Sequence, residues 1–264
     1  MITLSKKTSP NPTGTQSIDR VLSILKKVAQ HNESGVRLSD LSKELELHTA
    51  TVHRMLSILV KEGWVSMDPV SKAYHLGYEI FALGANANQF KVKDLLHGVV
   101  ERVAEQVGDA TYLVVQSGHD ALCLDRKVGK FGVQVLTFEV GQQRPLGIGA
   151  GSLALLAELP RDQAEIIIKG NEARYINFGR TAEQIQSAVN HSRRVGYGLS
   201  EKTVTPDTVG VGVVVKNSEG QAVAAISVAG IATRMEPSKR KDIVKLIKAE
   251  IAKIDKNTLT RPKT

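Results

Sequence analysis

Residues 38–76 constrain the fold of this chain more than any other stretch. They read LSDLSKELELHTATVHRMLSILVKEGWVSMDPVSKAYHL. The apolar spacing predicts a short helix, a turn at 46–48, a longer helix over 49–62, and two alternating strands at 64–67 and 72–76. This order is typical of a winged helix-turn-helix, a module that places its second helix in a DNA groove. Two short helices and a hairpin also occur in protein–protein modules, so the pattern alone leaves that interpretation open.

Polar side chains gather where the second helix of this motif is expected to begin. In helix-turn-helix proteins this end contacts base edges, and the preceding helix crosses the phosphate backbone. Threonine and histidine can donate or accept hydrogen bonds, and arginine can bind guanine or phosphate through two bonds. The predicted DNA-binding residues are Ser39, expected to cap the preceding helix, then Thr49, Ala50, Thr51, His53 and Arg54 at the helix start, and Lys72 near the tip of the wing.

Helical periodicity and stop signals frame this motif. Apolar residues recur at three- and four-residue spacing from Ser17, a candidate N-cap, to Ala29, which predicts another helix ahead of it. The buried stripe of the 49–62 helix is expected to be Val52, Leu56, Leu59 and Val60, with Met55 beside them. Gly63 suits the left-handed position that ends a helix. Residues 1–14 are polar and rich in Pro, Gly, Ser and Thr, which predicts a flexible arm.

The charge of the chain does not by itself locate a nucleic-acid site. The formal net charge is +8, but residues 1–90 hold ten Lys and Arg against eight Asp and Glu. The excess lies mostly in residues 239–264, with nine basic against three acidic side chains. A single N-terminal module is therefore expected to bind DNA weakly, so that affinity depends on pairing two modules. Aromatic residues make up only 4% of the chain, which argues against a single-strand binder that stacks bases.

Residues 78–257 predict a linking helix followed by a mixed domain. We expect a helix over 78–93, weakened by Gly84, and an amphipathic helix over 94–107. Strands are predicted at 111–116, 121–127, 133–138, 209–216 and 222–228, and further helices at 153–159, 161–169, 182–195 and 240–256. Thr181 and Gln184 have capping-box spacing, and Ser238 is expected to start the last helix. Hairpins with interspersed helices indicate the α+β class.

A run of small residues from Gly147 to Ser152 precedes one of these helices, and Arg144-Pro145-Leu146 leads into it. Such a run lets a ligand approach the backbone, and the N–H groups at a helix start favour an anion such as a carboxylate. The spacing matches neither G-x-G-x-x-G nor a P-loop, so no nucleotide cofactor is expected. A tight turn that packs a helix would explain the same residues equally well.

Candidate catalytic residues are few. Cys123 lies in an apolar run and is expected to be a small buried hydrophobe rather than a nucleophile. The chain has no G-x-S-x-G motif, and His119 and His191 lack metal-ligand spacing and are expected at the surface. We therefore expect no enzyme, no metal and no cofactor. The alternatives are a vestigial small-molecule enzyme built on the C-terminal domain, which turnover of a bound ligand would reveal, and an oligomeric adaptor that binds no ligand.

The N-terminal motifs resemble the IclR family of bacterial transcriptional regulators. QSIDRVLSIL at 16–25, Thr51-Val52-His53-Arg54, and a wing that ends in Tyr74-His75-Leu76-Gly77 carry the resemblance. It implies a winged domain that binds double-stranded operator DNA. Where the family usually has Pro-Lys-Ser ahead of Thr-Val-His-Arg, this chain has His48, Thr49 and Ala50. The operator sequence therefore cannot be taken from relatives.

The resemblance extends through the second domain. Leu124–Arg126, the Arg-Pro-Leu sequence at 144–146, Arg193–Tyr197 and Ala224–Gly230 are similar to the IclR-type effector-binding domain, which is GAF-like. By position it implies an effector site made of Gly149, Ala150, Gly151, Ser152, Ser200, Gly210, Ser227 and Ala229. Ser200 stands where an Asp is common, and Gly210 where a Cys is common. The pocket thus loses an acid and gains volume, so we expect a bulkier carboxylate, aromatic or otherwise, rather than a short 2-oxoacid.

These observations predict a two-domain chain, an α-rich winged helix-turn-helix followed by an α+β (GAF-like) effector-binding domain. The expected boundaries are a flexible arm at 1–14, the DNA-binding domain at 15–77, a linker helix at 78–93, the effector-binding domain at 94–257 and a tail at 258–264. Half-site recognition implies a homodimer or tetramer. No segment has the length and apolarity of a signal-peptide core or a membrane span, so we expect a cytoplasmic protein with no membrane partner.

Overall fold

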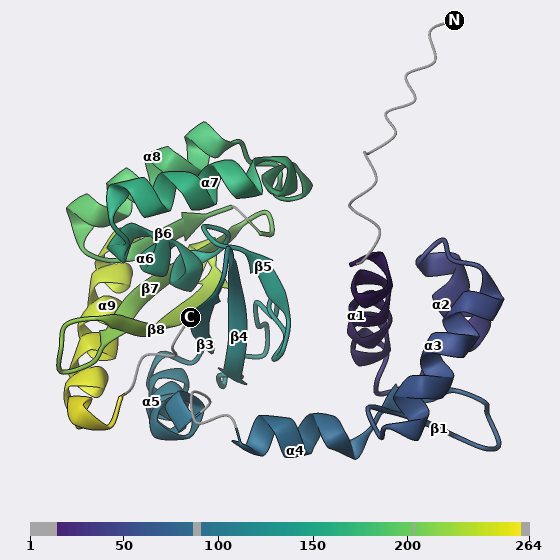
Figure 1. The fold of residues 1–264 in the computed structure, drawn as a ribbon. Coiled ribbons are helices and arrows are strands. Elements are labelled where there is room, and N and C mark those ends of the chain that lie inside the picture. Colours follow the sequence, from purple (N-terminus) through teal and green to yellow (C-terminus); the bar gives the residue numbers. More distant parts are fainter. Residues whose placement is uncertain (1–14, 87–90, 203, 260–264) are drawn as a thin grey trace, which may run out of the picture. The chain divides into compact units, whose positions relative to one another are not determined.

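The computed structural model describes residues 15–86, 91–202 and 204–259, and the chain divides into two units after residue 88 (Figure 1). The first unit contains helices α1 (Gln16–Gln30), α2 (Leu38–Glu44), α3 (Thr49–Lys61) and α4 (Tyr78–Asn86), with strands β1 (Val65–Met67) and β2 (Tyr74–Leu76). The order helix, turn, helix and antiparallel hairpin agrees with the winged helix-turn-helix predicted from the sequence.

Apolar side chains from α1, α2, α3 and the wing share one core in this unit. Ile24, Leu41, Val52 and Leu56 have no exposed surface. The turn between α2 and α3 passes through Glu46, whose φ of 52° is left-handed. The backbone of Val36 pairs with Tyr74 and adds a third short extended segment to the wing. As a result α3 has one face held in the core and the opposite face open.

Some local predictions in the first unit are wrong. The first helix begins at Gln16, so Ser17 lies inside it, with Thr15 at the N-cap. Ser39 does not cap α2, because the helix already begins at Leu38 with Arg37 at the N-cap; the Ser39 hydroxyl instead lies 3.4 Å from the Asp40 carboxylate. Val60 is 38% exposed, since it lies about 100° around the helix from buried Leu59.

The predicted linker helix over 78–93 includes residues 87–90, which lie outside the described residues. On either side of them the structure has helix α4 up to Asn86 and helix α5 (Lys91–Val107), which contains residues 91–93. Val92 is buried in the second unit, which explains why these residues belong there and not to the linker. The predicted arm at 1–14 and the last residues of the predicted tail, 260–264, lie outside the described residues.

The second unit is built on a six-stranded sheet with the order β5-β4-β3-β8-β7-β6, in which every neighbouring pair is antiparallel. Its strands are β3 (Ala110–Ser117), β4 (Asp120–Lys127), β5 (Gln143–Pro145), β6 (Gly198–Glu201), β7 (Thr208–Lys216) and β8 (Ala222–Ile231). Besides α5, its helices are α6 (Ala150–Glu158), α7 (Arg161–Tyr175), α8 (Ala182–Val195) and α9 (Pro237–Ala252), with 3-10 turns at Ile176–Phe178, Ala232–Arg234 and Lys256–Thr258. The α+β class is confirmed.

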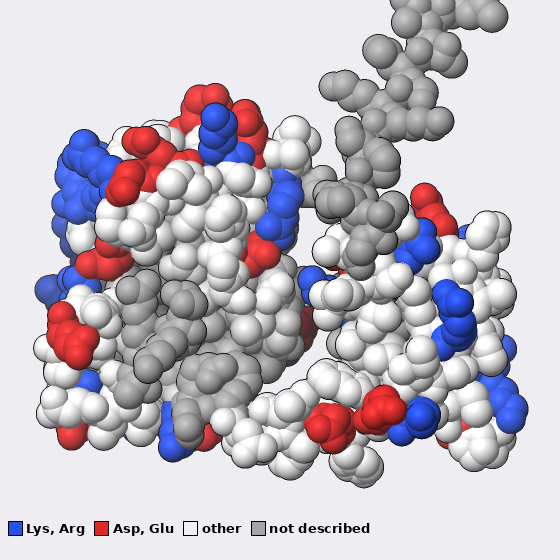
Figure 2. Space-filling model, viewed as in Figure 1, with Lys and Arg blue, Asp and Glu red and all other residues white. Residues whose placement is uncertain are grey.

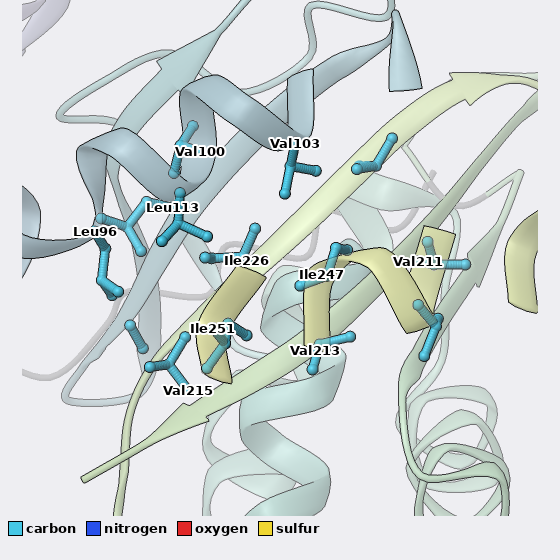
Figure 3. Close-up of a cluster of buried hydrophobic side chains, with 14 of the residues drawn as sticks. Leu96, Val100, Val103, Leu113, Val211, Val213, Val215, Ile226, Ile247 and Ile251 are labelled. Carbon is cyan, nitrogen blue, oxygen red and sulfur yellow. The ribbon is translucent and has the colours of Figure 1, made fainter. Parts of the chain in front are cut away.

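Helices cover both faces of this sheet (Figure 1). Side chains alternate along β3: Leu113 joins the core beneath α5 and α9, which Figure 3 shows, whereas Tyr112 and Val114 join the core with α6, α7 and α8. The α6 residues from Ala150 to Leu156 are all buried, as expected for a helix that is apolar on every side. Helix α6 is therefore buried in the core on the face of the sheet that α7 and α8 also cover.

Several predictions differ in the second unit. Residues 133–138 form no strand; β4 pairs at Asp120–Leu122 with β5, and the Gln142 carbonyl accepts the Cys123 N–H. Instead, Val135 and Phe138 turn their side chains into the core. Helix α7 continues beyond Lys169 to Tyr175, and α6 begins at Ala150, ahead of the predicted start at 153. Neither β5 nor β6 was predicted.

The last helix begins at Pro237, with Glu236 at the N-cap and Ser238 inside, and it ends at Ala252. The capping box of Thr181 and Gln184 is present as predicted. Within the described residues, no helix is both long and apolar enough to span a membrane.

Candidate DNA-binding surface and ligand pocket

The residues predicted to contact DNA lie on the open side of the first unit. Thr49, Ala50, His53 and Arg54 are exposed near the start of α3, and Thr51 is half-buried. His48 occupies the N-cap without a side-chain hydrogen bond, so no side chain caps the N–H groups of the first turn. Such a helix end attracts phosphate oxygens. Ser39 is exposed on α2, the preceding helix.

The wing turn presents the remaining predicted residue. Lys72 is exposed and takes a left-handed φ of 58°. The Asp68 carboxylate accepts hydrogen bonds from the N–H groups of Ser71 (2.7 Å) and Val70 (2.8 Å), and these bonds hold the pKa of Asp68 below its ordinary value. The turn is therefore organised by an ionised acid, and Lys72 follows it. On the face shown in Figure 2, the basic side chains of this unit are scattered among uncharged surface.

All of the predicted effector residues lie around one pocket in the second unit. The pocket has a cavity volume of about 50 Å³, which is below the usual range for small-molecule sites. It combines the start of α6 with residues from β6, β7 and β8, segments that are far apart in the sequence. Its lining includes Gly149, Ala150, Gly151, Ser152, Ser200, Gly210, Ser227 and Ala229.

The start of α6 is shaped by close backbone approach. Gly149 holds the N-cap at φ 90°, and no side chain caps the helix. The Ser152 hydroxyl accepts the Gly147 N–H at 2.7 Å. A Cβ on Gly198 would lie 2.1 Å from the Ala150 carbonyl oxygen, and one on Gly212 would lie 2.5 Å from it. These two glycines, absent from the prediction, let α6 rest directly on β6 and β7.

Gly210 has a mixed effect on the pocket. A Cβ there would lie 3.2 Å from the Cβ of Ala150, a tight contact. The missing side chain therefore lets α6 come close as well as opening space.

The polar lining includes groups that sequence reasoning missed. Arg144 and Phe138 line the pocket, and the Arg144 guanidinium lies over the Phe138 ring at 4.5 Å. Tyr112 lines it too, with its hydroxyl donating to the Val135 carbonyl. Arg144 stood in the Arg-Pro-Leu sequence ahead of the glycines, but a sequence does not show which arginine is buried.

Catalytic groups are poorly placed. Burial raises the pKa of the Cys123 thiol to about 12, so it stays protonated and is not a nucleophile. His119 is exposed and His191 half-exposed. In the described part of the chain, no group of three His, Cys, Asp or Glu side chains could hold a metal ion.

Comparisons with known proteins agree with this architecture. Residues 17–69 match the IclR helix-turn-helix domain, and residues 85–256 match the family model described as bacterial transcriptional regulator IclR C-terminal. The chain is 29% identical over 206 residues to the HTH-type transcriptional regulator KipR of Bacillus subtilis, covering 77% of this chain and 82% of that one.

Solved structures of similar proteins share the fold. An IclR transcriptional regulator from Alicyclobacillus acidocaldarius is 23% identical with a TM-score of 0.75, covering 92% of this chain and 98% of the other. An IclR homologue from Microbacterium hydrocarbonoxydans, complexed with 4-hydroxybenzoate, is 20% identical with a TM-score of 0.73, covering 92% and 99%. With a helix-turn-helix unit, an α+β unit that has a pocket, and both family models matched in order, the chain belongs to the IclR family of bacterial transcriptional regulators.

Proposed function

We propose that this regulator binds operator DNA through α3 and the wing, and that a small carboxylate bound in the pocket of the second unit changes its DNA affinity. The observation that carries the proposal is the convergence of the whole predicted effector set on one pocket, in a chain that also has an open recognition helix. An effector alters DNA affinity to the extent that it binds the two functional states unequally.

The DNA half of the proposal rests on exposure and charge. Arg54 is exposed near the start of α3 and forms no ion pair within the described residues. We expect Arg54→Gln to weaken operator binding by about 10- to 100-fold, the usual cost of losing a base contact. Lys61→Gln removes the same charge from the far end of α3, where Lys61 is largely exposed, and should change affinity little.

Gel shifts with the intergenic DNA upstream of the protein's own gene cluster measure both effects. Absence of salt-sensitive, sequence-specific binding by the wild-type protein would contradict the DNA half. Equal losses in both variants would contradict the placement of the contact at the helix start.

The effector half names a carboxylate with an apolar body. The pocket lining is largely apolar, with valines and Phe138 beside a few hydroxyls and one guanidinium. The Microbacterium homologue complexed with an aromatic carboxylate supports this class. Such a ligand should raise the midpoint of thermal unfolding of the whole protein, because it binds only the native state, and should alter the gel shift in the same concentration range.

The active form that we propose is a homodimer or a pair of such dimers. Helix α4 has no buried residue, although Tyr78, Phe81 and Leu83 are on it. Ile18 and Leu22 of α1 are exposed in the same unit. A second copy of this unit would cover these exposed apolar side chains. Pairing also suits recognition of two DNA half-sites, because a single unit carries little net positive charge.

We propose no enzymatic role, and a cytoplasmic location where the DNA lies. The buried, protonated thiol of Cys123 supports the first point. Turnover of a bound carboxylate in a purified sample would revive the enzyme alternative, and the absence of any ligand response would favour the adaptor.

A further inference from the structure

Arg144 differs from the other buried charged residues in the described part of the chain. Asp109 is paired with Arg234 at 2.5 Å, Asp125 with His97 at 2.6 Å, and Glu250 with both Arg102 and Lys253. Arg144 is only 7% exposed, yet no carboxylate among the described residues lies within 4 Å of it. A buried charge without a counter-charge lowers the stability of the fold, so an anionic partner from outside the chain would compensate Arg144.

The surroundings of Arg144 leave most of its hydrogen-bonding capacity unused. A guanidinium has five N–H donors in one plane. The Phe138 ring covers a face of that plane, and the only hydrogen bond within the described residues is a long one, 3.4 Å, to the Gln142 side chain. The nearby acid, Glu139, is bound to Arg126 at 2.7 Å. The in-plane donors therefore remain available in a residue that lines the pocket.

Other lining groups complete a site for a ligand with a polar substituent. Ser200 and Ser227 are each 7% exposed, and neither hydroxyl has a hydrogen-bond partner among the described residues. Val114, Val135 and Ile148 supply apolar walls. A ligand that excludes water from these hydroxyls without bonding to them loses affinity.

We propose that Arg144 binds the carboxylate of the effector, and that the two serine hydroxyls bind a hydroxyl or carbonyl elsewhere on an apolar, flat body. The inference rests on the proposed ligand function of this pocket. In this arrangement the preference for an anionic ligand comes from the guanidinium, which can donate two parallel hydrogen bonds to a carboxylate, and not from the start of α6 alone. The stack on Phe138 holds the guanidinium in position before the ligand arrives.

The test compares acids with their neutral amides on the full-length protein. Isothermal titration uses benzoate and 4-hydroxybenzoate against benzamide and 4-hydroxybenzamide. The acids should bind at least tenfold more tightly than the amides. Arg144→Gln should weaken acid binding about 10- to 100-fold, the range for a charge-assisted pair, and bring the acid-to-amide ratio close to one. Arg144→Lys should keep the preference for acids but bind them less tightly, because lysine keeps the positive charge and lacks the paired N–H donors of the guanidinium.

Arg126→Gln is the matched control, since Arg126 is on the neighbouring strand β4 and already has an acidic partner. It should leave the acid-to-amide ratio unchanged. Unfolding of the ligand-free protein separates binding from structure: Arg144→Gln should leave the thermal midpoint unchanged or raise it, because it removes an uncompensated buried charge. A strongly lowered midpoint would show a structural role and overturn the inference.

The remaining outcomes separate this inference from the regulatory function. Equal binding of acids and amides by the wild type, or binding of neither, overturns the role of Arg144, whereas operator binding is tested independently by gel shift. If acids bind through Arg144 but leave the gel shift unchanged, the inference stands and the proposed regulation fails.

Discussion

At the scale of single residues, glycine decides where the pocket can form. Gly198 and Gly212 are not in the left-handed region, so their role is close approach and not backbone freedom. The carbonyl of Ala150 lies where their side chains would be. The pocket depends on this contact because it fixes the start of α6 against β6 and β7.

Gly212→Ala is expected to destabilise the second unit by about 1–3 kcal/mol, the usual cost of overpacking, and to weaken ligand binding. The added Cβ would lie 2.5 Å from backbone, which cannot move aside as a flexible side chain could. Gly132→Ala is the control, because a Cβ there meets nothing within 4 Å. Urea unfolding curves measure both, and equal stability of the two variants would contradict this account.

At the scale of elements, local sequence signals predicted the helices better than the strands at the edges of the sheet. Helix α8 was predicted with its bounds, because Thr181 and Gln184 cap one end and Gly196 takes the left-handed conformation at the other. The strand predicted at 133–138 failed, although its alternation was suitable. A strand also needs a partner edge, which no local pattern specifies, and the short β5 is the segment that pairs with β4, at Asp120–Leu122.

The capping box of α8 gives a prediction at this scale. Thr181→Ala removes the side-chain acceptor for the Gln184 N–H and should cost about 1 kcal/mol of stability. Ser187→Ala is matched in chemistry but lies exposed in the middle of the same helix, and should have almost no effect. Chemical unfolding distinguishes them; a loss no larger at Thr181 than at Ser187 would count against the capping role.

At the scale of the whole molecule, exposed apolar side chains of the first unit point to self-association. Tyr78 is 93% and Phe81 75% exposed in the single chain. Their positions on α4 suit burial against a second copy, and pairing two modules would compensate for the weak charge of each.

Phe81→Glu is therefore expected to shift the protein toward monomer and to weaken operator binding by at least about tenfold. Ile166→Glu, at an exposed apolar position on α7 of the other unit, should leave pairing through the first unit intact. Sedimentation velocity and gel shifts measure the two effects. A Phe81→Glu protein that stays fully dimeric and binds DNA normally would exclude α4 from the interface.

Much of this protein was determined locally by its sequence. The helix-turn-helix order and the small-residue run at 147–152 are short-range patterns, and they predicted these local elements. The resemblance to the IclR family, carried by motifs such as T-V-H-R at 51–54, implied the other residues that line the pocket. Short-range patterns suffice there because helix periodicity and turn residues act over a few positions.

Tertiary structure alone decided the rest. That Arg144 is buried without an acid, that Phe138 stacks on it, and that Gly198 and Gly212 admit the start of α6 all depend on segments brought together by the sheet. Burial and the absence of a counter-charge are properties of three-dimensional neighbours, and no spacing along the chain specifies them.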